Sequence, residues 1–479
     1  MGKDGVYVKL PYVIRRLFST EYMVKEHLRR GEITPTREAY GNSFRIAAPA
    51  VAEMVSIAIM GMMDMIMVAQ LGPQSVTAIG LTGQPRMIFF SVFFALNIAV
   101  TAIVARNKGA GDDAAARSCL RHAMMLVAVF GTMISALAII TARPMMQLAG
   151  ALPDTIGLST SYFRISSFGL VFAIMANTIC AGQRAAGNTK ITMQVNIVAN
   201  IVKVLFNFLL IEGRFGFPRL EVDGAAVSLV MANVISFGLA FASLLKKDAY
   251  LRISRKDNWR PDTPMLKTIG RVASGGMLEQ LALRIGFFIS ARVIAGLGTI
   301  EAAAHFITQQ LMILSFAFAD GLGVATTALV GQNLGKKRPD LSIMYGKIGT
   351  RLAWTVAALL STTAFLTRYQ FPLLFALGND PEIVQMTAGA ILILVYAMPF
   401  QTAQIVMAGS LRGAGDTRFV AMTMLVTVAI IRPGLGALLA YPLGWGLTGA
   451  WIAILIDQFM RLVMLLTRFS GGRWIRDKL

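Results

Sequence analysis

Several charged and amide side chains interrupt the long apolar stretches of this chain, and they are the residues that could do chemistry there. Glu53 and Asp64 share the first such stretch, and at 100° per residue they lie about 20° apart around a helix. Asn196, Asn200, Lys203 and Asn207 recur at spacings of four, three and four, which forms one polar stripe on a helix. Carboxylates of this kind can take up H⁺ or bind Na⁺, so the pattern predicts an ion-coupling site.

The depth of these charges favours an ion pair. A charge at the centre of a bilayer costs roughly 2.5–3.5 kcal/mol on translocon scales, so each one needs a cavity or a partner. Asp64 and Lys203 stand at similar distances from the outer ends of their predicted helices. We therefore expect Asp64 and Lys203 to pair, with Asn200, Asn207 and Glu53 beside them. The alternative for Glu53 and Asp64 is a pair of structural hydrogen-bond acceptors.

The composition is that of a membrane protein. Of 479 residues, 56% are apolar and 15% charged, whereas soluble domains average about 25% charged residues. The net charge of +20 does not indicate nucleic acid, because Lys and Arg gather in some loops and avoid others, as membrane topology predicts. Two distant cysteines and three scattered histidines predict no disulfide framework, no metal site and no cofactor beyond a coupling ion.

Twelve stretches satisfy the length of about 20 apolar residues that a membrane-spanning helix needs. They are 44–70, 78–105, 117–142, 157–182, 190–212, 223–246, 268–296, 301–331, 347–369, 384–410, 418–440 and 447–469. We expect an all-α polytopic protein with an N-terminal segment 1–43, a six-helix lobe 44–246, a linker 247–267, a second six-helix lobe 268–469 and a tail 470–479. The N-terminal segment fits either an amphipathic helix on anionic lipid or a solvated tail.

The loops predict the orientation. Lys and Arg crowd the connection between the halves, the segment after residue 335 and the end of the chain, whereas the turns 71–77, 297–300 and 441–446 contain neither. Both termini are therefore expected in the cytoplasm of a multi-pass cell-membrane protein.

Two glycine-rich stretches nearly repeat each other, at 181–190 and 408–418, and Arg45 with Arg271, Glu53 with Glu279 and Gly109 with Gly335 repeat at almost the same offset. Duplication at half-chain length predicts two pseudo-symmetric lobes with a substrate path between them. In each copy the glycines would end one helix, and Asn188-Thr189 or Asp416-Thr417 would cap the next. A phosphate-binding loop is the alternative, but no strand precedes either copy.

These residues resemble the multidrug and toxic compound extrusion (MATE) family, prokaryotic type, over nearly everything from Arg45 to Trp474. The resemblance rests on Ala48-Pro49, on Asp64 before Leu71-Gly72, on Ala303-Ala304-His305, on 328–335 and on the two glycine-rich turns. It implies two six-helix lobes that form a V-shaped cavity, and export of organic compounds driven by inward Na⁺ or H⁺ flow.

The chain departs from the family at both ion sites that the resemblance implies. Relatives with a first-lobe proton site have an Asn and an Asp four apart on helix five, where this chain has Lys203 and Asn207. Na⁺-using relatives have an acid on helix seven and an Asp on helix ten, and here the helix-ten position is Gln401. We therefore expect ion coupling in the first lobe. The residues expected to contact substrate are Gln401, Gln404, Glu279, Arg284 and Asn177.

Three other buried charges are predicted to be structural. Asp457 and Arg461 stand four apart and would satisfy each other, and Arg432 precedes Pro433, where backbone carbonyls freed by a kink could hold it.

The functional prediction is a monomeric antiporter, not an enzyme, that exports amphipathic or cationic organic compounds in exchange for H⁺ or Na⁺ by alternating access. The alternatives are a flippase for lipid-linked or polar metabolites on the same scaffold and, from a different class, a channel or a receptor. A channel lacks support because the sequence contains no repeated selectivity-filter motif. An ATP-driven pump lacks support because no Walker-type loop is present.

Overall fold

The predicted all-α class is confirmed. The computed structural model describes residues 18–69, 71, 73–149, 151, 155–211, 213–246, 249–253, 259–374 and 381–476. Every regular element within these ranges is a helix.

The first lobe begins after two short 3₁₀ turns, η1 (Thr20–Tyr22) and η2 (Glu26–Leu28). Its helices are α2 (Thr36–Ala69), α3 (Pro73–Ala110), α4 (Asp113–Leu126), α5 (Thr132–Ile140), α6 (Ala142–Leu148), α7 (Ile156–Phe168), α8 (Leu170–Ala185), α9 (Thr189–Leu210) and α10 (Glu221–Leu245). A π-helical turn joins α4 to α5, and α7 meets α8 at an angle of 46°. The single stretch predicted over 157–182 is therefore a bent pair of helices.

The second lobe repeats this plan. Its helices are α11 (Thr263–Ala295), α12 (Thr299–Gly335), α13 (Pro339–Thr367), α14 (Pro381–Gly413), α15 (Thr417–Met424), α16 (Arg432–Ala440), α17 (Gly446–Ser470) and α18 (Arg473–Arg476). A π-helical turn, Leu425–Ile431, joins α15 to α16.

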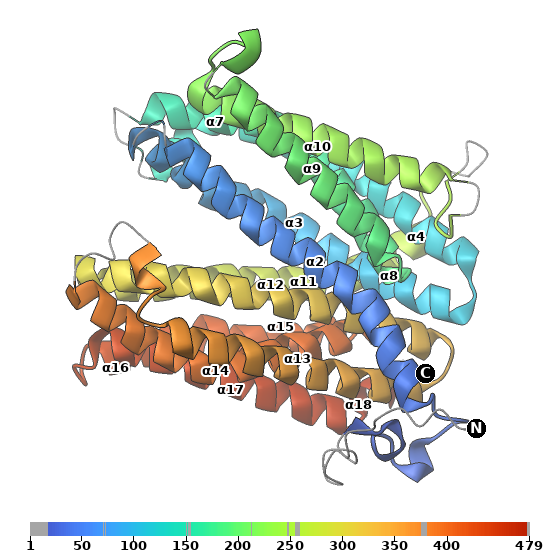
Figure 1. Ribbon diagram of the computed structural model, residues 1–479. Coiled ribbons are helices and arrows are strands. Elements are labelled where there is room, and N and C mark those ends of the chain that lie inside the picture. The colour runs from blue at the N-terminus through green and yellow to red at the C-terminus, as the bar shows by residue number, and fades with distance from the viewer. Residues whose placement is uncertain are drawn as a thin grey trace, which may run out of the picture.

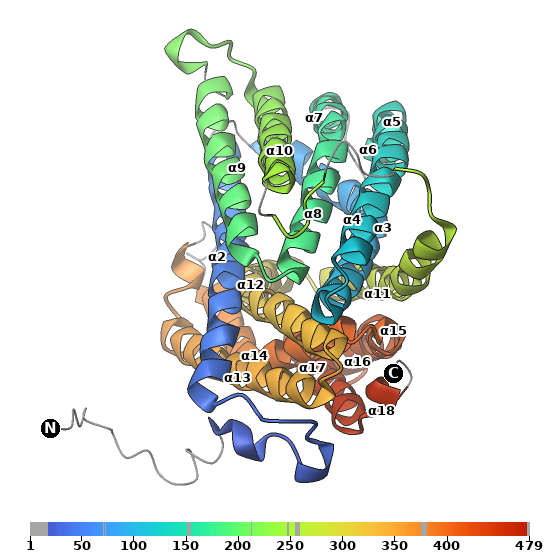
Figure 2. The ribbon, with the colours of Figure 1, turned by 90° about the vertical axis from the view of Figure 1, so that its right-hand side faces the viewer.

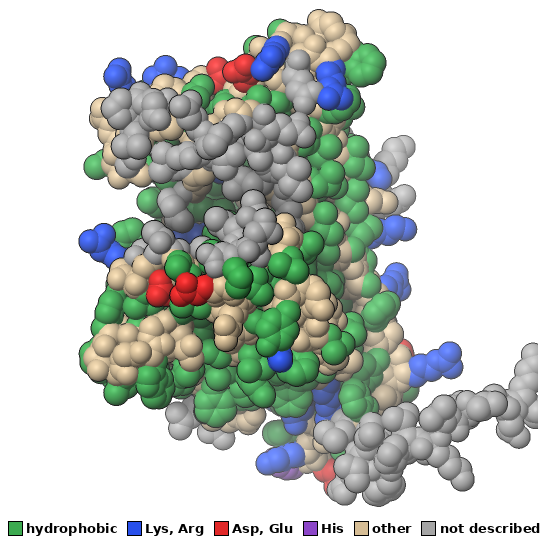
Figure 3. All heavy atoms as spheres, turned by 60° about the vertical axis from the view of Figure 1, so that its left-hand side comes forward, with side chains coloured by type: hydrophobic (Ala, Val, Ile, Leu, Met, Phe, Trp, Pro, Cys, Tyr) green, Lys and Arg blue, Asp and Glu red, His purple; other side chains and the backbone are tan. Residues whose placement is uncertain are grey.

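The chain is a multi-pass membrane protein. Within the described ranges, nine helices are long and apolar enough to cross a membrane, and the bent pair α7–α8 makes ten. The helices α11 and α13 have 33 and 29 residues, so they are also long enough to span, and the count of twelve stays a prediction. Apolar side chains cover much of the face in Figure 3, with Lys and Arg toward its edges.

The two lobes come closest at one end of the molecule, where small residues let helix backbones touch. A Cβ atom on Gly109 would overlap the backbone carbonyl of Gln332, and one on Gly335 would overlap that of Arg106. The amide of Gln332 also donates to the carbonyl of Ala185 at 2.8 Å. The ribbons of the lobes diverge away from this end (Figure 1), which we call the closed end.

Helix α2 belongs to both lobes. Its first turns pack on the second lobe, where Ala39 joins a buried cluster with Met344 and Ile348, while Glu53, further along, bonds to the first lobe. Figure 2 shows α2 running beside both lobes at the closed end. Since these first turns cover protein, α2 begins at Thr36 rather than at the predicted residue 44.

The N-terminal segment from Phe18 to Pro35 lies on the second lobe, and we call it the strap. Met23 and Val24 are buried in the same cluster as Ala39, and the ammonium group of Lys347 donates to the carbonyl of Met23 at 2.6 Å. The strap is therefore held by protein contacts, whereas residues 1–17, which complete the predicted lipid-binding or solvated segment, lie outside the described residues.

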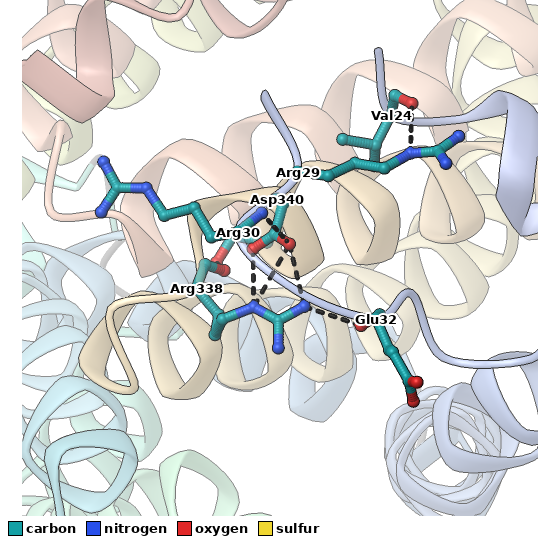
Figure 4. Close-up of polar contacts among 7 residues, drawn as sticks. Val24, Arg29, Arg30, Glu32, Arg338 and Asp340 are labelled. Carbon is teal, nitrogen blue, oxygen red and sulfur yellow. Dashed lines mark hydrogen bonds and ion pairs between the residues drawn. The ribbon is translucent and has the colours of Figure 1, made fainter. Parts of the chain in front are cut away.

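A buried carboxylate anchors the strap (Figure 4). Asp340 accepts from the guanidinium of Arg338 at 2.9 Å and from the backbone N–H of Arg30 at 3.0 Å, and Arg338 also donates to the carbonyl of Glu32 at 2.7 Å. Desolvation alone would raise the pKa of Asp340, but Arg338 and the backbone N–H groups of Arg30 and Leu341 hold that pKa below its ordinary value. The charged form of Asp340 is therefore the form that the fold stabilises.

Candidate functional site

A cavity of about 730 Å³ lies between the lobes and receives side chains from both. Aromatic and aliphatic residues form much of its wall, among them Phe94, Phe287, Phe316, Met54 and Met312. Charged side chains line it as well, and they are Glu53, Arg184, Glu279, Arg284, Asp320, Arg412 and Arg461. Pockets of this volume and mixed character accommodate organic ligands.

In the first lobe, the charged part of the wall is a fully bonded glutamate. The Glu53 carboxylate accepts from Arg184 Nη1 at 2.7 Å, from the Thr192 hydroxyl at 2.6 Å and from the Asn196 amide at 2.8 Å. Glu53 is only 1% exposed, and its partners come from α8 and α9. Such a group is satisfied by the protein itself.

The second lobe places a glutamate and an arginine in the same way. Glu279 Oε1 accepts from Arg412 Nη2 at 2.9 Å. Arg184 and Arg412 each stand three residues before a turn glycine, and those glycines, Gly187 and Gly415, have φ angles of +81° and +80°. The duplication inferred from sequence is therefore repeated at the level of individual side chains.

The residues that follow the turn glycine also correspond between the two copies. The Thr189 hydroxyl donates to the carbonyl of Ile46 at 3.0 Å, and the Thr417 hydroxyl donates to that of Val272 at 3.3 Å. Each threonine stands two residues after its turn glycine. Corresponding residues of α9 and α15 can therefore be compared one by one.

The two glutamates differ in their remaining partners. The positions of Thr192 and Asn196 in the first lobe are taken in the second by Val420 and Met424, which offer no donor. Accordingly, Glu279 Oε2 is buried and has no hydrogen-bond partner among the residues that the structure describes. The second lobe thus keeps the ion pair but omits the two neutral donors.

A second carboxylate joins Glu279 in the cavity. Asp320 on α12 has an exposed side chain that lines the cavity wall, and the charges that act on it are those of Arg412 and Glu279. Its carboxylate has no hydrogen bond or ion pair with any part of the chain that the structure describes. Asp320 and the Glu279–Arg412 pair therefore line the wall of one cavity.

Sequence analysis missed Asp320, Arg184 and Arg412 as site residues. Asp320 was detectable, because it is an isolated charge within the apolar stretch 301–331, the same criterion that selected Asp64. The two arginines stand inside the repeated glycine-rich motif, which we interpreted only as a turn.

Four of the predicted substrate-contacting residues line the cavity, and they are Asn177, Glu279, Arg284 and Gln404. The guanidinium of Arg284 lies 3.6 Å from the sulfur of Met87 across the lobe boundary. Gln401 is fully buried, and its amide donates to the carbonyl of Met312 at 3.5 Å, so it lies behind the wall. Substrate contact stays a prediction for all five.

The predicted coupling residues divide between two places. Asn200, Lys203 and Asn207 line a separate pocket of about 340 Å³ inside the first lobe, together with Arg86 and Tyr162. Glu53 lies in the central cavity instead. The side chain of Asp64 falls outside the described residues, so its pairing with Lys203 stays a prediction.

The remaining buried charges form one cluster. Arg461 Nη2 donates to Asp457 at 2.5 and 2.6 Å, as the spacing predicted. Arg432 also bonds to Asp457, at 3.0 Å from its Nε, so its partner is a carboxylate and not the backbone carbonyls we expected. One acid thereby holds two arginines.

The glycine-rich turns differ from the prediction in one respect. Asn188 and Asp416 occupy the N-cap positions of α9 and α15, but neither side chain makes a capping hydrogen bond. The Asp416 carboxylate instead accepts from Arg468 at 2.8 Å. A salt bridge to α17 takes the place of the expected cap.

Comparisons with known proteins agree with this arrangement. The MatE family model matches residues 49–209 and again residues 277–438, once in each lobe. A probable multidrug resistance protein NorM from Agrobacterium fabrum is 30% identical over 421 residues, which cover 85% of this chain and 88% of that protein. The multidrug resistance protein PmpM of Pseudomonas aeruginosa is 26% identical over 448 residues, which cover 90% of this chain and 92% of that protein.

Solved structures share the fold. A structure described as the outward-facing conformation of a multidrug resistance MATE family transporter of the MOP superfamily superposes with a TM-score of 0.84 at 20% sequence identity. The match covers 95% of this chain and 99% of that one. The chain therefore belongs to the MatE family, whose members are transporters and not enzymes.

Proposed function

We propose that this protein is a secondary antiporter that exports small organic compounds in exchange for H⁺ or Na⁺ by alternating access. We expect amphipathic or cationic substrates, and the similar proteins are named for multidrug resistance. The protein works as a monomer in the cell membrane with both termini in the cytoplasm, and the coupling ion is its only cofactor.

The central cavity carries this proposal. It lies at the boundary of two pseudo-symmetric lobes, has the volume of a ligand site and combines aromatic walls with both carboxylate and guanidinium groups, which suits amphipathic organic compounds. The lobes meet tightly at the closed end through Gly109 and Gly335. The glycine contacts themselves involve no side-chain bonds, so parting the lobes there requires breaking few interactions, among them the hydrogen bond from Gln332 to the carbonyl of Ala185, when the lobes rock about the cavity.

Flux in proteoliposomes tests the proposal. We expect a fluorescent organic cation such as ethidium to move against its gradient when an opposing H⁺ or Na⁺ gradient is imposed, to saturate with concentration, and to stop when an ionophore collapses that gradient. The two ions are imposed separately to identify the coupling ion. Transport that ignores both gradients would support a flippase, and flux that does not saturate would support a channel.

Cysteine labelling tests the orientation. Cys119 and Cys180 are buried, so the background reaction with a membrane-impermeant maleimide is low. In intact cells we expect Leu443→Cys to react and Lys336→Cys to stay unreacted, since these exposed residues lie at opposite ends of the molecule. The reverse pattern would invert the topology.

A further inference from the structure

We propose that Arg284 binds an anionic group, a carboxylate or another oxyanion, on the organic compounds that this protein exports. The inference rests on the proposed function and deepens it by naming a chemical group that substrates carry. Arg284 stands eleven residues before Ala295, the end of α11, which is about 16 Å along a helix, and it lines the central cavity. Its charge therefore lies deep in the protein, beside the space that substrate would occupy.

Arg284 differs from the other arginines of the cavity wall in its partners. Each of the others forms an ion pair with an acid, and these pairs are Arg184–Glu53, Arg412–Glu279 and Arg461–Asp457. Within the described ranges Arg284 has one polar contact, from its Nη2 to the sulfur of Met87 at 3.6 Å, and a thioether is a weak acceptor. Its Nε is buried and has no hydrogen-bond partner there. The contacts within the protein therefore do not account for this charge.

The chemistry of a guanidinium indicates what is missing. An arginine side chain is not deprotonated in proteins, so Arg284 keeps its charge in the cavity. Because an unpaired charge inside a membrane is costly, such residues face a cavity or a partner and mark substrate paths. The planar fork of N–H groups matches a carboxylate or a phosphate with two parallel hydrogen bonds. An oxyanion on a bound compound would satisfy both the charge and the buried Nε of Arg284.

The wall next to Arg284 carries further positive charge. Asp457 holds two arginines, Arg461 and Arg432, so this cluster keeps one positive charge in excess. The guanidinium of Arg432 lies over the ring of Phe287, 5.1 Å from its centroid, and Phe287 is one turn from Arg284 on α11. Two positive charges that no described acid offsets therefore lie near one aromatic side chain of the cavity.

The acids of the cavity do not reverse this balance. The cavity wall and the groups paired with it hold five arginines and four acids, and the acids are Glu53, Glu279, Asp320 and Asp457. An anionic group at Arg284 would thus be bound where positive charge is in excess. The same compound can carry a cationic group as well, since Asp320 lines the cavity and has no ion pair in the described ranges.

Two dyes that differ in one group test the inference. Rhodamine 110 carries a free carboxylate, and rhodamine 123 is its methyl ester with the same ring system. We would measure the equilibrium binding of each dye to the purified protein in detergent by fluorescence anisotropy. Wild type should bind rhodamine 110 about tenfold to a hundredfold more tightly than rhodamine 123, which is the range expected for a hydrogen-bonded charge.

Variants of Arg284 assign this difference to one side chain. Arg284→Gln should bring the two affinities together by weakening rhodamine 110, whereas Arg284→Lys should keep part of the difference. Since no acid in the described part of the chain pairs with Arg284, neither variant strands a carboxylate there. The matched control is Arg292→Gln, which removes an exposed arginine of the same helix that does not line the cavity, and it should keep the wild-type difference.

Two outcomes would overturn the inference. One is equal affinity of the wild type for the two dyes, and the other is a difference in affinity that Arg284→Gln leaves unchanged. Because the binding measurement needs no ion gradient, either outcome would leave the transport proposal standing. A wild type that distinguishes the dyes but moves neither ethidium nor rhodamine 110 in proteoliposomes would instead refute the proposed function.

Chemical modification of the wild type covers the case in which a variant does not fold. Phenylglyoxal reacts with accessible guanidinium groups, and mass spectrometry locates the adducts. We expect Arg284 to react and to be protected by rhodamine 110 but not by rhodamine 123, while Arg292 reacts equally in the presence of either dye. An Arg284 that stays unreacted, or whose reaction rhodamine 110 does not slow, would contradict the assignment.

Discussion

Glu53 and Glu279 occupy corresponding places in the two lobes, and each bonds to an arginine three residues before a turn glycine, but they differ in what completes their coordination. Three protein donors satisfy Glu53. Glu279 has one, and its other oxygen is bare. Duplication has therefore produced two copies of one Glu–Arg ion pair. In the first copy both glutamate oxygens are hydrogen-bonded, and in the second copy one of them has no donor among the described residues.

The difference teaches how duplicated helices can place the same ion pair in two different surroundings. In the first lobe a threonine and an asparagine on the following helix complete the hydrogen bonds of the glutamate. In the second lobe apolar residues take both positions, so the glutamate keeps the arginine alone among the described residues.

Replacing each glutamate separately should give the largest difference in stability between the two lobes. Glu53→Ala leaves Arg184 and two amide or hydroxyl donors without their acceptor, and breaking such a buried pair costs about 3–5 kcal/mol. Glu279→Ala strands only Arg412 and also removes the bare oxygen, so it should cost less. Thermal unfolding of the purified variants measures the loss of stability in each. Equal losses would contradict the conclusion that Glu53 accepts more hydrogen bonds than Glu279.

Transfer of the first-lobe donors should complete the hydrogen bonds of Glu279. In Val420→Thr combined with Met424→Asn, a hydroxyl and an amide stand where Thr192 and Asn196 stand in the first lobe. They would hydrogen-bond Glu279, and we expect the double variant to be more stable than wild type by about 1–3 kcal/mol, since a buried carboxylate oxygen gains the donor that it lacks. Thermal unfolding of the purified variant measures the change.

The reverse transfer is the matched control. Thr192→Val with Asn196→Met removes two donors from Glu53 and should cost about 1–3 kcal/mol of stability for each donor lost. A Val420→Thr, Met424→Asn variant that is no more stable than wild type would mean that the second oxygen of Glu279 gains nothing from a protein donor.

Much of the fold could be predicted from the sequence, because span length and apolar content depend on the bilayer and not on tertiary detail. The predicted stretches 190–212 and 418–440 agree closely with α9 and with α15–α16. The start of α2 was misplaced, since its first turns are polar enough to resemble a tail and their packing on α13 is not visible in the sequence.

The candidate site was harder to predict. The repeat showed that Glu53 and Glu279 occupy corresponding positions. Their hydrogen-bond partners, however, depend on single differences between the lobes, such as Asn196 in the first and Met424 in the second. They also depend on how the helices cross, which sequence periodicity does not encode. Asp320 illustrates the limit, because its charge was visible in the sequence, while its place on the same cavity wall as Glu279 and Arg412 depends on how α11, α12 and α14 pack.

The smallest difference in stability that we expect between the lobes lies at the turns that follow α3 and α12. In the second lobe Asp340 is buried and anchors the strap, whereas the nearest acid of the corresponding first-lobe turn, Asp113, is exposed and 3.9 Å from Arg117. Asp340→Asn should cost about 1–3 kcal/mol, because it weakens charge-assisted bonds at a buried position. Asp113→Asn, the matched control, should stay within about 0.5 kcal/mol, as exposed pairs do.

The pH dependence of stability provides a second readout of the same contrast. The fold lowers the pKa of Asp340, so its contribution is present above the pKa of the unfolded chain and is lost as the pH falls through the lower pKa of the folded protein. Thermal unfolding followed from neutral to acidic pH should therefore show a steeper decline for wild type than for Asp340→Asn, while Asp113→Asn follows wild type. Parallel curves for wild type and Asp340→Asn would mean that the strap is held by the burial of Met23 and Val24 and not by the carboxylate.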